Sequence, residues 1–192
     1  MSEKTSDVKI IAFVGMCGSG KSTAIEVLTK QNIPKVYFGG VILNAIKEAG
    51  LEITPENEKR FREELRQKEG KDFIVNRVVK DTKSLIEAGQ KRVVLDGLYS
   101  WTEYKILRKE FQHELTVVAI IAPKLVRRKR LANRKERPFT MQESAERDKT
   151  EIENLEKGGP IAIADYYIDN SGTIEELQQN VKKLLEQIDF FN

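Results

Sequence analysis

The feature that most constrains this chain is the octapeptide at residues 15–22, Gly-Met-Cys-Gly-Ser-Gly-Lys-Ser, which has the spacing G-x-x-x-x-G-K-S. An apolar run at residues 8–14 precedes it, and a stretch with helical patterning at residues 23–30 follows it. Glycines let the backbone turn tightly enough for successive N–H groups to face one anion. A helix that begins near Lys21 adds the positive end of its dipole. This strand–loop–helix context predicts a phosphate-binding loop.

The expected ligands of such a loop are ATP and Mg²⁺. Lys21 is expected to reach the β- and γ-phosphates, and the Ser22 hydroxyl is expected to ligate Mg²⁺. An ordinary glycine-rich turn between a strand and a helix is the alternative interpretation. The residues predicted to contact ATP along the loop are Gly15, Cys17, Gly18, Ser19, Gly20, Lys21, Ser22 and Thr23.

Composition favours one compact domain over residues 1–192, since 40% of the residues are hydrophobic and 33% are charged. The net charge of +3 is too small to indicate a nucleic acid or a membrane surface as partner. No apolar run approaches the roughly eighteen residues of a membrane span, and the polar residues 1–7 do not resemble a signal peptide. Cys17 is the single cysteine, which excludes an intrachain disulfide. We therefore expect a cytoplasmic protein.

Apolar runs alternate with helical patterns along the whole chain, which predicts an α/β fold with three layers. A parallel sheet of five strands would carry helices on both faces. The expected strands are Lys9–Val14, Lys35–Phe38, Arg92–Asp96, Leu115–Ile121 and Tyr166–Ile168. Two mobile segments are expected around the carboxyl edge of the sheet, a flap at about residues 40–88 and a lid at about residues 123–150.

Helix boundaries are marked by capping residues. Thr54-Pro55 is typical of a helix start, with the threonine as cap and the proline in the first turn. Thr140 and Thr173 each stand three residues before a glutamate, which is the spacing of a capping box. Gly89 and Gly158 are predicted to end helices.

Ligands of an open parallel sheet collect outside the carboxyl ends of its strands. The third expected strand ends at Asp96-Gly97. A carboxylate at a strand end beside a phosphate-binding loop is placed near the metal or the acceptor hydroxyl. Asp-Gly is also a common turn. We predict that Asp96 is catalytic and that Asp96 and Gly97 contact the acceptor.

The segment from residue 123 to residue 147 is the most basic part of the chain. Arg127, Arg130, Arg134 and Arg137 recur at spacings of three or four, so they share one helix face and its exit loop. Phosphoryl transfer needs guanidinium groups that neutralise the transferred charge. We predict that Arg130 and Arg134 are catalytic, that Arg130 also contacts ATP, and that Arg137 contacts the acceptor. A solvated helix face is the alternative; a nucleic-acid surface would need interleaved aromatic residues.

Two further arginines, Arg66 and Arg77, lie in the helical region of residues 54–88, where a flap that holds substrate would lie. An anionic acceptor needs cations at that place. We predict that Arg66 and Arg77 bind the acceptor.

Taken together, the loop at residues 15–22, Asp96-Gly97 and the arginines of residues 127–137 resemble the P-loop nucleotide and nucleoside kinase superfamily. Adenylate, cytidylate, shikimate and dephospho-CoA kinases are members of it. The resemblance covers roughly residues 8–188. Residues 164–177 look like the closing strand, loop and helix of dephospho-CoA kinases, in which an Asn-x-Gly-Thr loop passes beside adenine. This resemblance implies that Asn170 and Gly172 contact ATP, and that the chain is an ATP-dependent kinase.

Residues 38–44 depart from the pattern of these kinases, because the usual acid is absent and Asn44 stands about where nucleoside monophosphate kinases carry an arginine. An amide cannot clamp phosphate as a guanidinium does. The favoured interpretation is a kinase similar to dephospho-CoA kinase. A nucleoside monophosphate kinase is the second, and a regulatory ATPase, favoured by the altered Gly39-Gly40, is the third. The small-molecule acceptor, dephospho-CoA or a nucleotide, and the oligomeric state stay open.

Overall fold

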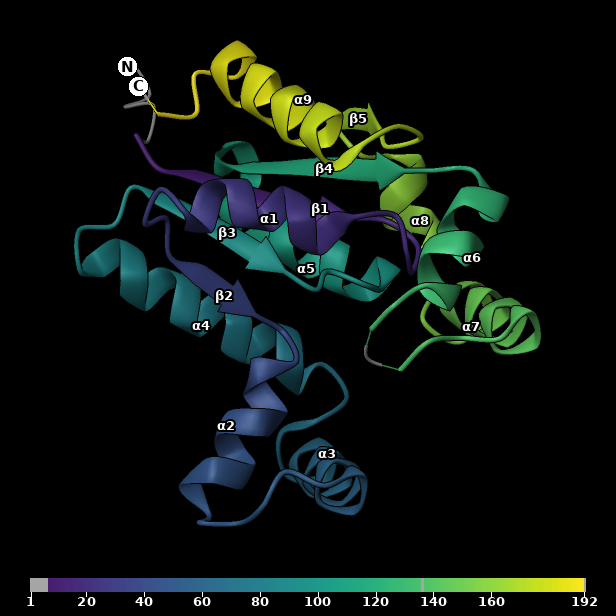
Figure 1. Cartoon of the computed structure of the whole chain (residues 1–192). Helices are drawn as coiled ribbons and strands as arrows, with labels where there is room; N and C mark the ends of the chain where they lie inside the picture. The colour runs from purple at the N-terminus through teal and green to yellow at the C-terminus, as the bar shows by residue number, and fades with distance from the viewer. Residues whose placement is uncertain (1–6, 136, 192) are drawn as a thin grey trace.

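Five parallel strands form the centre of the fold, in the spatial order β2-β3-β1-β4-β5 (Figure 1). The computed structural model describes residues 7–135 and 137–191. The strands are β1 Lys9–Val14, β2 Lys35–Tyr37, β3 Arg92–Asp96, β4 Leu115–Ile121 and β5 Tyr166–Asp169. All five predicted strands are therefore present, with β2 one residue shorter and β5 one residue longer than expected.

The helices lie on both faces of this sheet and at its carboxyl edge. The longer ones are α1 Lys21–Thr29, α2 Gly40–Glu48, α3 Pro55–Glu69, α4 Phe73–Glu87, α5 Trp101–Phe111, α6 Lys124–Ala132, α7 Met141–Glu153 and α9 Ile174–Gln187. The short helix α8 Gly158–Ala162 and a 3₁₀ turn, Gln112–Glu114, complete the described elements.

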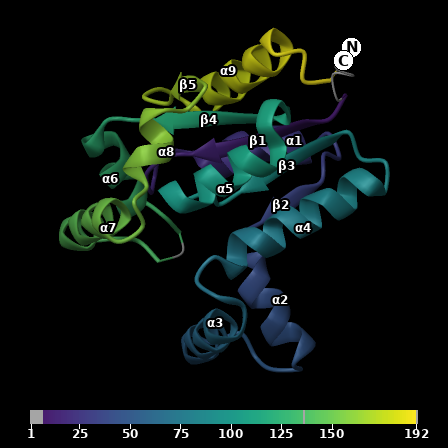
Figure 2. The same ribbon diagram turned by 180° about the vertical axis from the view of Figure 1, so that it is seen from behind.

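Two hydrophobic clusters, one on each face, hold the three layers together. Successive residues of β1 point to opposite faces: Ile10 and Ala12 belong to one cluster, and Ile11 and Phe13 to the other. The first cluster joins the sheet to α4 and α5, and the second joins it to α1 and α9 (Figures 1 and 2). A strand buried on both faces reads as a continuous apolar run, which is why the sequence predicts this sheet. The predicted three-layer α/β fold is confirmed.

Most of the predicted helix boundaries are confirmed. The Thr54 side chain accepts a hydrogen bond from the Asn57 N–H at 3.2 Å, and Thr140 and Thr173 both form complete capping boxes. Gly89 follows α4 with a φ of 93°. The prediction for Gly158 is wrong, because Gly158 begins α8. Pro160 lies in the first turn of α8, where a proline has no N–H bond to lose.

Two groups of helices project from the sheet (Figures 1 and 2). One consists of α2 and α3 and extends from the β2 edge; the other consists of α6 and α7 at the carboxyl edge. Within the predicted flap, α4 does not project, because Phe73, Val75 and Val78 are buried in the first cluster. Among the described residues, no helix has the length and apolar character needed to cross a membrane.

Candidate functional site

The loop at residues 15–22 leaves the carboxyl end of β1, the central strand, and enters α1. Its glycines are required by close packing. Gly15 has a φ of +149°, and a Cβ there would lie 2.4 Å from the Ile120 carbonyl oxygen. Gly20 has a φ of +105°, and a Cβ there would lie 2.2 Å from Asn170 Nδ2. Only glycine fits either position, so the loop keeps its tight curve around its own N–H groups.

Lys21 folds back over this loop. Its Nζ donates hydrogen bonds to the Gly15 carbonyl at 2.7 Å and to the Met16 carbonyl at 3.2 Å. Burial, with a further contribution from the positive charge of Lys157, lowers the pKa of Lys21 to about 8. An anion would favour the charged ammonium more strongly than carbonyl oxygens do.

The first turn of α1 completes the cradle. The Ser22 side chain is exposed there, and Thr23 is half-buried. The residues present therefore fit a nucleoside triphosphate with Mg²⁺: a curved glycine loop, an ammonium, a helix N-terminus and an exposed hydroxyl.

Asp96 lies beside this loop because β3 is the neighbour of β1, with Phe13 paired to Asp96. Its Oδ2 forms an ion pair with Lys35 Nζ of β2 at 3.2 Å, and its side chain is 22% exposed. Gly97 follows with a φ of +114°. The structure thus brings Lys21 and Asp96, which the sequence predicts to act together, to one edge of the sheet.

The arginines of α6 have different environments. Arg127 is buried and donates to the Cys17 carbonyl at 3.0 Å and to Asp148 Oδ1 at 2.7 Å. Arg130 donates to the carbonyls of Asn170 at 2.8 Å and Gly172 at 3.0 Å. Both guanidinium groups therefore hold neighbouring loops in place.

Arg134 and Arg137 differ from these two arginines. They are exposed in the loop between α6 and α7. Of the four predicted lid arginines, these two have the access to solvent that a mobile lid residue needs.

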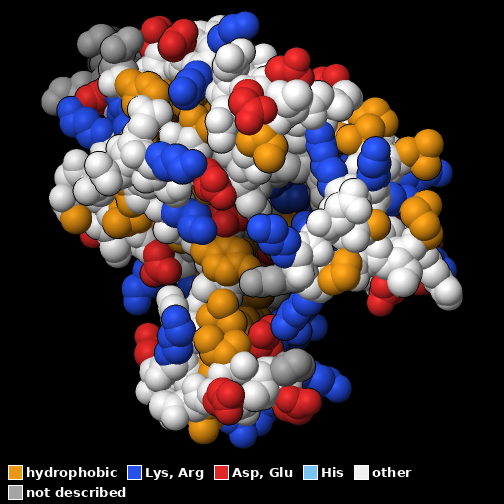
Figure 3. Space-filling model, viewed as in Figure 1, with side chains coloured by type: hydrophobic (Ala, Val, Ile, Leu, Met, Phe, Trp, Pro, Cys, Tyr) orange, Lys and Arg blue, Asp and Glu red, His pale blue; other side chains and the backbone are white. Residues whose placement is uncertain are grey.

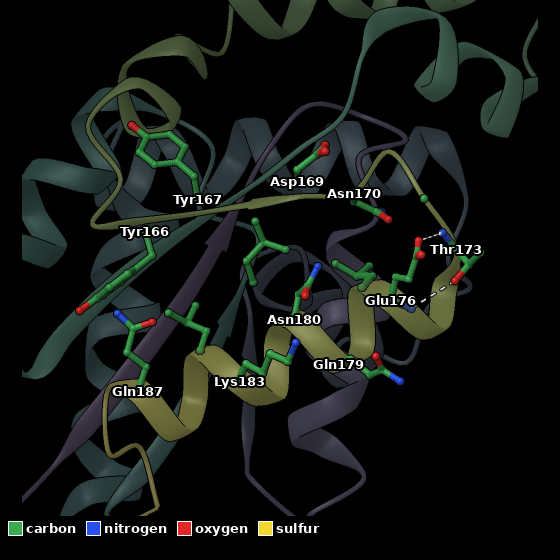
Figure 4. A pocket seen from close by; sticks show the side chains of 14 residues that line it. Tyr166, Tyr167, Asp169, Asn170, Thr173, Glu176, Gln179, Asn180, Lys183 and Gln187 are labelled. Carbon is green, nitrogen blue, oxygen red and sulfur yellow. Dashed lines mark hydrogen bonds between the residues drawn. The ribbon is translucent and has the colours of Figure 1, made fainter.

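The predicted adenine loop is packed directly against the phosphate-binding loop. Asn170 Nδ2 donates to the Ser19 carbonyl at 2.7 Å, and the Asn170 N–H donates to the Ile121 carbonyl at 2.7 Å. Asn170 also lines one end of a hollow of about 620 Å³ between β5 and α9 (Figure 4). At that end Thr173 and Glu176 form their capping box, shown by the dashed lines in Figure 4.

A cavity of about 670 Å³ separates the α2–α3 projection from α7 and from the loop after β3. Figure 3 shows hydrophobic side chains, flanked by Lys and Arg, between the lower projection and the rest of the molecule. Charged and aromatic side chains line this cavity. The cations are Arg62, Arg66, Lys71 and Arg147, the acids are Glu58, Asp72 and Glu103, and the aromatic rings are those of Tyr37, Phe38 and Tyr99. This lining suits an anionic molecule with an apolar or planar portion.

Arg66 and Arg77 do not lie together. Arg66 lines the 670 Å³ cavity, whereas Arg77 forms a two-point ion pair with Glu69 through contacts of 2.9 and 2.5 Å. Arg77 and Asn44 line another hollow, outside this cavity. The chain turns at Gly70 between α3 and α4, which places the two arginines on different sides.

Sequence reasoning missed a buried cluster on α7 and the segment after it. Glu151 and Lys157 are each 1% exposed, and their side chains meet at 2.6 Å. Arg147 forms an ion pair with Glu151 at 3.3 Å and lines the cavity. Since α7 is rich in charged residues of both signs, its sequence indicates only a solvated helix.

The fold and the loop define the class of protein, a P-loop protein with a kinase-like fold. Shikimate kinase from Bacteroides thetaiotaomicron superposes with a TM-score of 0.59 and 14% identity, over 94% of this chain and 98% of that chain. Dephospho-CoA kinase from Campylobacter jejuni superposes with a TM-score of 0.52 and 17% identity, over 95% and 98%. At these identities the likeness shows the fold alone.

Sequence comparison identifies the family. Residues 11–155 match the family model described as AAA domain. UPF0200 protein TK1334 of Thermococcus kodakarensis is 35% identical over 182 residues, which are 93% of this chain and 97% of the relative. The UPF0200/UPF0201 protein of Archaeoglobus fulgidus is 34% identical over 93% of this chain, which spans 55% of that longer relative. The chain belongs to the UPF0200 family, and its residues 11–155 form an AAA domain by the family model.

Proposed function

We propose that this protein is an ATP-dependent kinase of a small anionic molecule, with dephospho-CoA as the favoured acceptor. The observation that carries the proposal is the meeting of three features at one sheet edge. The phosphate-binding loop follows β1, Asp96 ends the adjacent β3, and the cation-lined cavity includes Phe38, whose N–H donates a hydrogen bond to the Asp96 carbonyl at 2.9 Å. A donor site, a carboxylate and an acceptor site in this order are what phosphoryl transfer requires.

The chain's own residues then have defined roles. Lys21 and the loop N–H groups bind the β- and γ-phosphates. Ser22 would hold Mg²⁺, which would supply further charge neutralisation. Asp96, held by Lys35, accepts the proton of the acceptor hydroxyl. The bond from the γ-phosphorus to the bridging oxygen breaks as the bond to the acceptor oxygen forms. Arg134 and Arg137 close over the transferred group from the exposed loop.

The choice of acceptor rests on two features. Asn44 lies outside the cavity, so the position of the nucleoside monophosphate kinase arginine offers no cation there. The likeness of residues 164–177 to dephospho-CoA kinases, with Asn170 packed on the phosphate-binding loop, supports a base site of that type. Arg66 would then contact the acceptor from the cavity wall, and Gly97 would contact it from the turn that precedes Tyr99 of the lining.

A nucleoside monophosphate kinase is the second candidate, because the four cations of the cavity suit a phosphate acceptor. A regulatory ATPase is the third. Gly39 favours it, since the Tyr37 ring lies 2.5 Å from where a Cβ of Gly39 would stand and fills part of the acceptor side.

An ADP-release assay separates these candidates. Dephospho-CoA, AMP, CMP, UMP and GMP are compared at equal concentration with Mg-ATP. We expect the fastest release with dephospho-CoA. A tenfold faster rate with one monophosphate would establish the second candidate. Slow, acceptor-independent release with all five compounds would favour the regulatory ATPase.

A further inference from the structure

Cys17, the third residue of the phosphate-binding loop, is held by both lid helices. Its carbonyl accepts a hydrogen bond from Arg127 of α6 at 3.0 Å, and its N–H donates to Glu151 Oε2 of α7 at 2.8 Å. Asp148 of α7 in turn forms an ion pair with Arg127 at 2.7 Å. The two helices are therefore fixed to the loop, and to each other, at one residue.

The second oxygen of Glu151 points to a different part of the site. Oε1 contacts Lys157 Nζ at 2.6 Å and Arg147 Nε at 3.3 Å. Lys157 Nζ lies 4.3 Å from the centre of the Tyr99 ring. Because Tyr99 and Arg147 both line the acceptor cavity, one buried carboxylate connects the phosphate-binding loop to the cavity wall.

Stability alone does not account for this buried cluster of charges. A buried ion pair loses the hydration of both charges, and a hydrophobic pair of similar size is often as stable. Here the pair lies beside the loop that must accept a polyanion. A lone carboxylate would repel phosphate, whereas Glu151 is outnumbered by Lys157 and Arg147, which leaves the cluster with one excess positive charge.

We propose that Glu151 and Lys157 are positioning residues for the phosphate-binding loop. Glu151 fixes the loop at Cys17 and fixes Lys157 and Arg147 at the boundary with the acceptor cavity, and Lys157 adds a second ammonium to the surroundings of Lys21. This role in binding rests on the proposed nucleotide site. The effect of Glu151 on the order of the ligand-free loop does not depend on that proposal.

The first test needs no ligand. In ligand-free protein, the backbone amide hydrogens of residues 15–22 should exchange at least about tenfold faster in Glu151→Gln than in the wild type. The neutral amide is a weaker hydrogen-bond acceptor for the Cys17 N–H, and it no longer forms an ion pair with Lys157. Glu153→Gln is the matched control, since Glu153 is exposed two residues further along α7. Unchanged exchange in folded Glu151→Gln would overturn the proposal.

The second test measures the affinity for Mg-ADP at one neutral pH. Lys157→Met removes the ammonium that pairs with the buried Glu151 carboxylate, so an uncompensated negative charge is left beside the phosphate-binding loop and the affinity should fall about tenfold. Lys157→Arg keeps the charge and should restore most of the affinity. Lys149→Met on the exposed face of α7 should leave the affinity unchanged.

A merely structural role for Lys157 would lower the melting temperature while the affinity for Mg-ADP stays at the wild-type value, and that result would overturn its part of the proposal. Wild-type protein that does not bind Mg-ADP at all would instead overturn the proposed function. In that case the exchange test still decides whether Glu151 positions the loop.

Discussion

The two sides of the site are built differently. The nucleotide side comprises residues 15–22, α6, α7 and residues 170–172. There Arg127 and Asn170 donate hydrogen bonds to the carbonyls of Cys17 and Ser19, and Glu151 accepts one from the Cys17 N–H. On the acceptor side, formed by α2 and α3, no described side chain of α3 is fully buried. Phe61 and Leu65 only pack partly against the core. The nucleotide side is thus held by direct contacts to its loop. On the proposed acceptor side α2 is anchored through the buried Ile42 and Ile46, whereas the described side chains of α3 attach it to the core only through partly buried residues.

The largest effect should come from the nucleotide side. Lys21→Ala is expected to lower turnover by roughly a few hundredfold, because losing one preorganised charged contact costs about 3–4 kcal/mol of transition-state stabilisation. Steady-state ADP release measures it. Lys30→Ala, exposed just after the same helix, is the control. Wild-type turnover in Lys21→Ala would mean that the loop is not catalytic.

Asp96 lies between the two sides, so its substitution should affect turnover and nucleotide affinity to different extents. Asp96→Asn is expected to lower turnover by about a hundredfold, since it removes the proton acceptor while it preserves size. Mg-ADP affinity, measured by calorimetry, should change less than threefold. An unaltered turnover with a lower melting temperature would make the pair with Lys35 a structural one.

On the acceptor side we expect a smaller effect, confined to the acceptor. Arg66→Ala should raise the KM for the acceptor about tenfold, as loss of one hydrogen bond to a charged group predicts. Arg77→Ala is the matched variant, because its guanidinium is occupied by Glu69 outside the cavity. Equal effects of the two substitutions would contradict the assignment of the cavity as the acceptor site.

The helix caps give the smallest and most direct comparison of the two sides. Thr173→Ala should lower the free energy of unfolding by about 1 kcal/mol, because α9 packs in the core and its cap is part of the global fold. Thr54→Ala should instead speed hydrogen exchange within α3 with little change in the global value. Chemical denaturation and exchange measure the two; equal global losses would show that the acceptor side is as rigid as the nucleotide side.

The sequence predicts well those parts of the site that are formed by consecutive residues. The loop at residues 15–22 is a local pattern, and Asp96 follows from the apolar run that it ends. The proposed acceptor cavity is lined by Tyr37, Arg66, Tyr99 and Arg147, which are far apart in the chain and have ordinary local contexts. Its composition therefore appears only when β2, α3, the loop after β3 and α7 are packed together.

Glu151 shows why part of the site escapes such prediction. On a helix with many charges, a glutamate is expected in solvent, yet tertiary packing leaves it 1% exposed. Arg77 shows the reverse: the sequence predicts that it binds the acceptor, whereas its guanidinium is paired with Glu69 across the turn at Gly70. Charge counting along a helix does not reveal partners that come from another segment.

The arrangement of the sheet has a practical consequence for engineering. The described ends of the chain lie side by side, since Lys9 Nζ at the start of β1 donates to the Ile188 carbonyl at 3.4 Å, just beyond α9. Six residues of β1 separate this place from the phosphate-binding loop, about 20 Å of extended chain. A fluorescent protein or an affinity tag joined near either described end would therefore lie at the sheet edge opposite the phosphate-binding loop. A circularly permuted variant would need only a short linker between residues 7 and 191.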